Sequence, residues 1–253
     1  MKTLLFIAAL SLSANLFATE MPERCKDMVG DRYQNRYDRF LNKQIKNKTI
    51  FVGSSSVANW KKIPTYFPEL SDGWKGLFYK NKEGKRKVDW KLLKEGPRKN
   101  YENFGVGGTQ ICHLHVYLDR LFVNRQGGIS PKRIVIYSGD NDLGNNYDAQ
   151  GIVDNYSALI QRIREKGVTT PIYIISTKPS FKRLHQSHII EDIGKRLEEQ
   201  LDGKDDVTII NTFEEFFKTN GDLREDYFVS DGLHLTRRAY EMWAKYLRKS
   251  WNN

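Results

Sequence analysis

Short polar motifs in this sequence carry the side chains that serine-based acyl transfer requires. A serine hydroxyl is a poor nucleophile unless a base removes its proton, and a histidine imidazole titrates in the range that suits this task. Three serines follow a glycine at residues 53–56, and a histidine stands three residues after an aspartate at residues 231–234. This chemistry therefore depends on a fold that brings the two distant stretches together.

Four such motifs follow predicted strands or precede the last predicted helix. They are Gly53-Ser54-Ser55-Ser56, Gly105-Val106-Gly107-Gly108, Gly139-Asp140-Asn141-Asp142 and Asp231-Gly232-Leu233-His234. Each has a structural explanation when taken alone, because glycine, serine, asparagine and aspartate are common in turns and helix caps. Ligands of an open parallel sheet bind beyond the carboxyl ends of its strands, so the joint occurrence of the four motifs indicates one site.

The elements that must position these motifs are visible in the hydrophobic pattern. Short apolar runs predict buried strands at residues 49–52, 132–138, 171–176 and 207–211, and a weaker run predicts one at residues 100–104. Amphipathic stretches predict helices at residues 152–166, 188–201 and 237–251. The alternation of strands with helices is typical of a doubly wound α/β domain built on a parallel sheet.

The N-terminal region predicts export. Residues 1–18 combine a short basic start, an apolar run and small residues, which is the pattern of a secretory signal peptide. We therefore expect a periplasmic or secreted protein, and no later segment is apolar enough to predict a membrane span. Residues 19–45 are predicted to form an N-terminal helical extension, and residues 46–253 one domain with a basic insertion at about 66–100.

The charge of the chain is strongly positive, at +10. Residues 73–102 contain ten Lys or Arg against four acidic residues, which fits either a solvated surface insertion or a segment that faces a polyanion. Cys25 and Cys112 could form a disulfide or both remain free. No Cys/His cluster has zinc-ligand spacing, and no metal or cofactor is expected.

The four motifs in their context resemble a known superfamily. The segments FVGSSSVANW, NFGVGGTQ, YSGDNDLG and DGLHLT look like the four sequence blocks of the SGNH (GDSL-type) hydrolases, and KPSFKR at 178–183 resembles a segment of bacterial members with the GSSS form. The resemblance covers residues 49–251 apart from the basic insertion. It implies a flavodoxin-like three-layer α/β/α sandwich. Position 54 is a serine where the first block usually has an aspartate. This position is not the nucleophile of the family, so the difference affects hydrogen bonding at the turn and leaves the expected catalysis unchanged.

The resemblance also implies a role for each site residue. Ser55 is the nucleophile, His234 the general base and then general acid, and Asp231 the group that fixes the imidazole tautomer. The oxyanion hole is formed by the backbone N–H groups of Ser55 and Gly108 and by the side-chain amide of Asn141. Glycine at position 108 lets the backbone approach the substrate closely.

The expected function is that of an exported serine esterase. Its substrates are short-chain acyl or acetyl esters, including O-acetylated glycans, and the basic insertion suits an anionic polymer. An O-acyltransferase, a lysophospholipase or a thioesterase would use the same site. A non-catalytic polyanion-binding protein with the same fold is the alternative from another class. No specific nucleic acid partner is expected.

Overall fold

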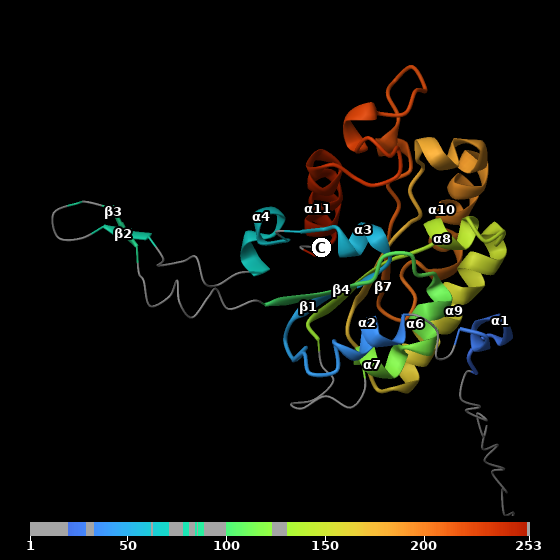
Figure 1. Cartoon of the computed structure of the whole chain (residues 1–253), viewed down its shortest axis with the longest axis horizontal. Coiled ribbons are helices and arrows are strands. Elements are labelled where there is room, and N and C mark those ends of the chain that lie inside the picture. The colour runs from blue at the N-terminus through green and yellow to red at the C-terminus, as the bar shows by residue number, and fades with distance from the viewer. Residues whose placement is uncertain are drawn as a thin grey trace, which may run out of the picture.

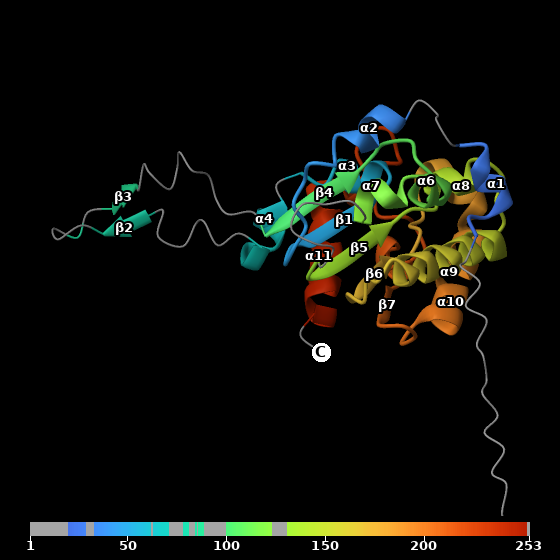
Figure 2. The ribbon, with the colours of Figure 1, turned by 90° about the horizontal axis from the view of Figure 1, so that it is seen from below.

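A parallel sheet forms the centre of the protein. The computed structural model describes residues 20–28, 33–61, 63–70, 78–80, 84, 86–88, 100–122 and 131–251. Within these residues, five parallel strands form one central sheet (Figure 1), in the order β4-β1-β5-β6-β7 (Figure 2). Their bounds are Thr49–Gly53 for β1, Tyr101–Gly105 for β4, Arg133–Tyr137 for β5, Ile172–Ile175 for β6 and Val207–Ile210 for β7. This is the flavodoxin-like order, so the predicted fold class is confirmed.

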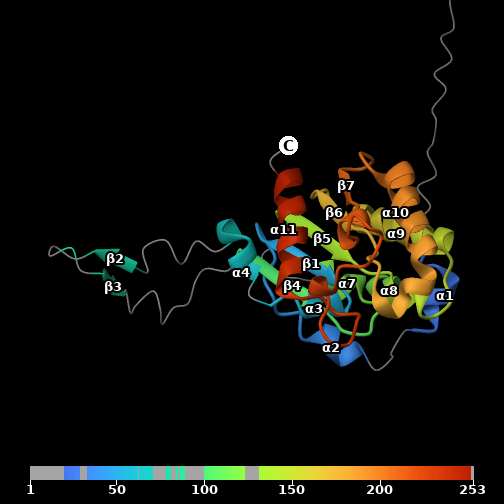
Figure 3. The same ribbon diagram turned by 90° about the horizontal axis from the view of Figure 1, so that it is seen from above.

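Helices cover both faces of the sheet, because successive strand residues point to opposite sides. Ile50 and Val52 of β1 pack into one core, which also contains apolar residues of α6 (Ile111–Val116), α7 (Leu118–Phe122), α9 (Ala149–Glu165) and α10 (Ser187–Leu201). Phe51, between them, packs into the second core with α11 (Arg237–Trp251). The views from below and from above show α9 and α11 on opposite sides of the sheet (Figure 2, Figure 3). The molecule is therefore the three-layer sandwich that the sequence predicts.

The three long helices match the amphipathic stretches closely. Helix α9 begins three residues before the predicted start, because the Asp148 carboxylate caps it by accepting a hydrogen bond from the Gly151 N–H at 2.8 Å. Shorter helices and 3-10 turns fill the connections: α3 (Ser55–Ala58), α4 (Ile63–Tyr66), α8 (Asp140–Leu143), Pro68–Leu70, Phe181–Gln186, Glu214–Phe216 and Glu225–Tyr227.

The N-terminal extension packs into the domain. It contains two short helices, α1 (Glu23–Lys26) and α2 (Gln34–Asp38). The Tyr37 ring stacks on Tyr117 with centroids 4.3 Å apart, and the Phe40 ring stacks on Phe104 at 4.7 Å. Cys25 forms a disulfide with Cys112 of α6, which settles the pairing that the sequence left open. The extension is thus held by both a covalent bond and aromatic packing.

The predicted basic insertion is described only in part. Strands β2 (Phe78–Lys80) and β3 (Arg86–Val88) pair with each other in an antiparallel ladder and not with the central sheet. Most of the insertion, and the predicted signal peptide at 1–18, lie outside the described residues. Among the helices that the structure does describe, none has the length and apolar character of a membrane span.

Candidate active site

The first motif places Ser55 at the carboxyl end of β1. The chain turns sharply at Gly53, whose φ is +147°, and a Cβ there would lie 1.8 Å from the Tyr137 carbonyl oxygen. The turn therefore requires glycine. The Ser54 N–H donates to the same carbonyl at 3.1 Å, and Ser55 then begins α3 with its side chain half-buried. The candidate nucleophile thus stands between the ends of β1 and β5, where the strand order reverses and flavodoxin-like folds bind ligands.

The second motif borders Ser55 directly. A Cβ on Gly107 would lie 3.7 Å from the Ser55 Cβ, so this loop passes beside the candidate nucleophile. Gly108 has a φ of +86°, and a Cβ there would come within 2.6 Å of the Tyr33 hydroxyl. Glycine at 108 is therefore required by the backbone conformation and by a side chain of the N-terminal extension.

The third motif contributes a side-chain amide at the end of β5. Asn141 donates through Nδ2 to the Thr109 carbonyl oxygen at 2.8 Å, which ties the third motif to the second. An amide nitrogen carries two protons, so this bond orients the second N–H. Asp142, fully buried, accepts from the Ile111 N–H at 3.0 Å, and burial raises the pKa of its carboxyl to about 7.

A buried ion pair stands beside Asn141. Lys178 Nζ donates to Asp140 Oδ2 at 2.8 Å, and the two side chains are 0% and 5% exposed. The Tyr137 hydroxyl donates to the same carboxylate oxygen at 2.6 Å, and burial raises the pKa of this tyrosine well above its ordinary value. The Asp140 carboxylate therefore has a cation and a hydroxyl that compensate for its removal from water.

The fourth motif forms the carboxylate–imidazole pair that the sequence predicts. Asp231 Oδ2 lies 2.5 Å from His234 Nδ1, and Oδ1 accepts from the backbone N–H groups of Leu233 and His234 at 2.9 Å each. These bonds, the imidazole bond first, hold the pKa of the Asp231 carboxyl well below its usual range. An ionised carboxylate only accepts, so Nδ1 carries the proton and Nε2 is left with the lone pair that a general base needs.

The segment after β6 connects the third and fourth motifs. The backbone N–H of Lys182 donates to the Gly232 carbonyl at 3.3 Å, and the Phe181 side chain packs against Gly232. Farther along, the Tyr240 hydroxyl of α11 donates to the Ser56 carbonyl at 2.8 Å, which links the helix after His234 to the helix that begins at Ser55.

Within the described residues, no hydrogen bond joins the Ser55 hydroxyl to His234. Such bonds are often long without substrate and tighten when it binds.

Comparison with protein families identifies the group. The model of the GDSL-like lipase/acylhydrolase family matches residues 51–242, which include all four motifs. The chain belongs to this family. Membership of this family supports an ester-hydrolysing serine hydrolase.

Solved structures share the GDSL-like fold at low sequence identity. A candidate platelet activating factor from Streptococcus pneumoniae has a TM-score of 0.62 and 21% identity, with 86% of this chain and 90% of that chain covered. A candidate acylhydrolase from Bacteroides fragilis has a TM-score of 0.57 and 18% identity, and the match covers 87% of this chain and 94% of that chain. A GDSL-like lipase from Bacteroides thetaiotaomicron has a TM-score of 0.57 and 16% identity, and the match covers 87% of this chain and 95% of that chain. A comparison with curated proteins finds no match.

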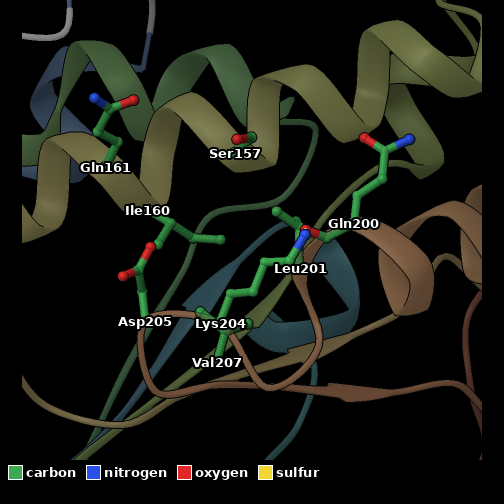
Figure 4. A pocket seen from close by; sticks show the side chains of 8 residues that line it. All are labelled: Ser157, Ile160, Gln161, Gln200, Leu201, Lys204, Asp205 and Val207. Carbon is green, nitrogen blue, oxygen red and sulfur yellow. The ribbon is translucent and has the colours of Figure 1, made fainter.

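A cavity elsewhere in this GDSL-like hydrolase is separate from the site. It has a volume of about 270 Å³ and lies between α9 and α10, beside Val207 at the start of β7 (Figure 4). The candidate site lies at the opposite ends of the strands, and none of its residues lines this cavity. In the described ranges, no group of three or more His, Cys, Asp or Glu residues is placed to hold a metal ion.

Three residues around the site of this family member were not assigned a role from the sequence. Lys178 belongs to the KPSFKR segment, but nothing in the sequence identifies Asp140 as its partner. Tyr33 and Arg36 donate hydrogen bonds to carbonyl groups of the second motif. Backbone carbonyls occur at every position, so no sequence signal distinguishes the ones that these side chains reach.

Proposed function

We propose that this family member is an exported carboxylesterase that removes short acyl groups, acetyl in particular, through an acyl-enzyme on Ser55. The Asp231–His234 pair is the observation that carries the proposal, because it presents an imidazole in the tautomer of a general base. The position of Ser55 at the carboxyl end of β1, directly beside Gly107 of the second motif, supports its role as the nucleophile.

The reaction proceeds in two halves. His234 Nε2 takes the Ser55 proton as the Ser55 oxygen attacks the ester carbonyl, and the resulting oxyanion accepts from the N–H groups of Ser55 and Gly108 and from the Asn141 amide. The C–O bond to the alcohol then breaks, and the imidazolium gives the alcohol its proton. Water, deprotonated by His234, attacks the acyl-Ser55 carbonyl, and the acid leaves as Ser55 recovers its proton.

Export and the substrate class rest on separate observations. The predicted signal peptide at 1–18 and the Cys25–Cys112 disulfide support an oxidising compartment outside the cytoplasm. The net charge of +10 favours attraction to an anionic polymer. An O-acetylated, negatively charged glycan is therefore the proposed natural substrate.

The test compares two neighbouring serines. Ser55→Ala should abolish hydrolysis of 4-nitrophenyl acetate, while Ser54→Ala should leave it intact, because the Ser54 hydroxyl is buried and has no hydrogen-bond partner among the described residues. Equal activity of Ser55→Ala and wild type would refute the role of Ser55 as the nucleophile. Acyl esters of increasing length should then show a preference for acetyl, and acetate release from acetylated glycans, measured with and without an acceptor sugar, separates hydrolysis from acyl transfer.

A further inference from the structure

The N-terminal extension contacts the loop that supplies an oxyanion donor in the proposed mechanism. Residues 33–45 precede the part of the chain that the family model matches, which begins at residue 51. Tyr33, Tyr37 and Phe40 are nevertheless buried in the larger core, so this segment is an integral part of the domain. Its contacts with the second motif are additional to the family's shared blocks.

Two side chains of the extension bind consecutive peptide groups of that loop. Arg36 Nη1 donates to the Gly107 carbonyl oxygen at 3.3 Å, and the Tyr33 hydroxyl donates to the Gly108 carbonyl oxygen at 3.1 Å. The Gly107 carbonyl and the Gly108 N–H belong to one planar peptide unit, so fixing the direction of the oxygen also fixes the direction of the N–H. A cation on the carbonyl oxygen additionally polarises the peptide and makes its N–H a stronger donor.

Neighbouring groups hold the two side chains in place. The Tyr33 ring makes an edge-to-face contact with His113 at 4.7 Å between centroids, and Arg36 lies 5.5 Å from the centroid of the Tyr33 ring. The ring of His113 in turn accepts a hydrogen bond from the Gln110 N–H at 3.0 Å, at the end of the same loop. Because Gly108 has no Cβ, the Tyr33 hydroxyl can lie directly against its backbone.

We propose that Arg36 and Tyr33 are positioning residues of the oxyanion hole. Arg36 fixes and polarises the Gly107–Gly108 peptide so that its N–H points at the developing oxyanion. Tyr33 holds the next peptide, Gly108–Thr109, and thereby keeps Gly108 in the backbone conformation that directs this N–H. This inference rests on the proposed function, since it assigns the Gly108 N–H to the oxyanion. The oxyanion exists in the transition state and not in the bound ester, so the contribution of both residues falls on kcat rather than on KM.

The experiment compares two arginines of the extension in the full chain with its disulfide intact. Arg36→Gln should lower kcat for 4-nitrophenyl acetate roughly 3- to 10-fold, the effect of about one hydrogen bond, with KM unchanged. Arg39→Gln removes the same charge from the same extension, but Arg39 packs on Phe40 and, among the described residues, makes no hydrogen bond to the loop. The kcat of Arg39→Gln for 4-nitrophenyl acetate should therefore match that of wild type. Tyr33→Phe, which keeps the ring, should lower kcat by a similar factor.

A transition-state mimic separates positioning from general structural damage. A trifluoromethyl ketone forms a tetrahedral adduct with a catalytic serine, so its affinity should fall in Arg36→Gln by the same factor as kcat, while inhibition by the product acetate stays constant. Equal kcat values for Arg36→Gln and Arg39→Gln, or a change confined to KM, would overturn the inference. Wild-type activity that survives in Ser55→Ala would instead overturn the proposed function, so the two failures are distinguishable.

Discussion

The disulfide between Cys25 and Cys112 should be a major contributor to stability. It closes a loop between residues 87 positions apart, and both cysteines are completely buried. In the chain-entropy treatment, a cross-link over a loop of this length disfavours the unfolded state by about 4.5 kcal/mol. For a chain of this size, that free energy corresponds to a decrease of roughly 10–15 °C in the midpoint of thermal unfolding when the bond is removed.

Thermal unfolding of three variants measures this contribution. Cys25→Ala, Cys112→Ala and the double variant should all melt at nearly the same reduced temperature, because either substitution removes the whole bond and the second adds little. Wild type in the presence of a reductant should approach the same value, whereas the double variant should not respond to the reductant. The reasoning is refuted if the double variant melts within about 2 °C of wild type, or if the two single effects add.

Further substitutions test the site and the charges around it. Asp231→Asn should reduce kcat about 10⁴-fold with the fold intact, because an amide favours the wrong imidazole tautomer; a loss below tenfold would contradict this. Lys178→Met should lower the unfolding free energy by about 3–5 kcal/mol in urea titrations, because it leaves a buried charge unpaired, and adding Asp140→Asn should restore part of it. Burial sets the pKa of Asp142 at about 7 and that of His115 at about 4. The Asp142 contribution to stability is lost as pH rises through 7, and that of His115 as pH falls from 6.5 to 4. Asp142→Asn leaves only the contribution of His115, so the free energy of unfolding of this variant should fall on acidification. His115→Gln leaves only the contribution of Asp142, so its free energy of unfolding should fall as pH rises. Parallel pH profiles of the unfolding free energy in the two variants would exclude these pKa assignments.

The strands and the Asp231–His234 pair could be predicted from sequence because their signals are local. A strand buried on both faces reads as a continuous apolar run, as residues 134–137 of β5 do, and its end is marked by a glycine. Asp231 and His234 lie three residues apart, so one turn brings the carboxylate to Nδ1 without help from the rest of the fold. Resemblance to a family then supplied the distant partner, Ser55.

The disulfide and the buried ion pair could not be predicted in the same way. Cys25 and Cys112 meet because the extension packs on α6, and two cysteines in a sequence are equally consistent with free thiols. Lys178 looks like an ordinary charged residue until the fold places it against Asp140, 38 positions earlier, with neither side chain open to solvent. Both pairings depend on which elements pack together, and hydrophobic periodicity does not specify that.

The contacts of the extension illustrate a stricter limit. Arg36 and Tyr33 reach carbonyl groups 71 and 75 residues away, and a carbonyl group has no residue type by which a sequence could mark it. The sequence signals these contacts only by the absence of a side chain at Gly108. The family resemblance explains this glycine by the close approach of substrate. The structure gives that glycine a second role on its other side, where the Tyr33 hydroxyl occupies the space of a Cβ. If both roles hold, Gly108→Ala should lower activity even toward the smallest ester, because the methyl group would displace Tyr33 and turn the peptide that carries the oxyanion donor.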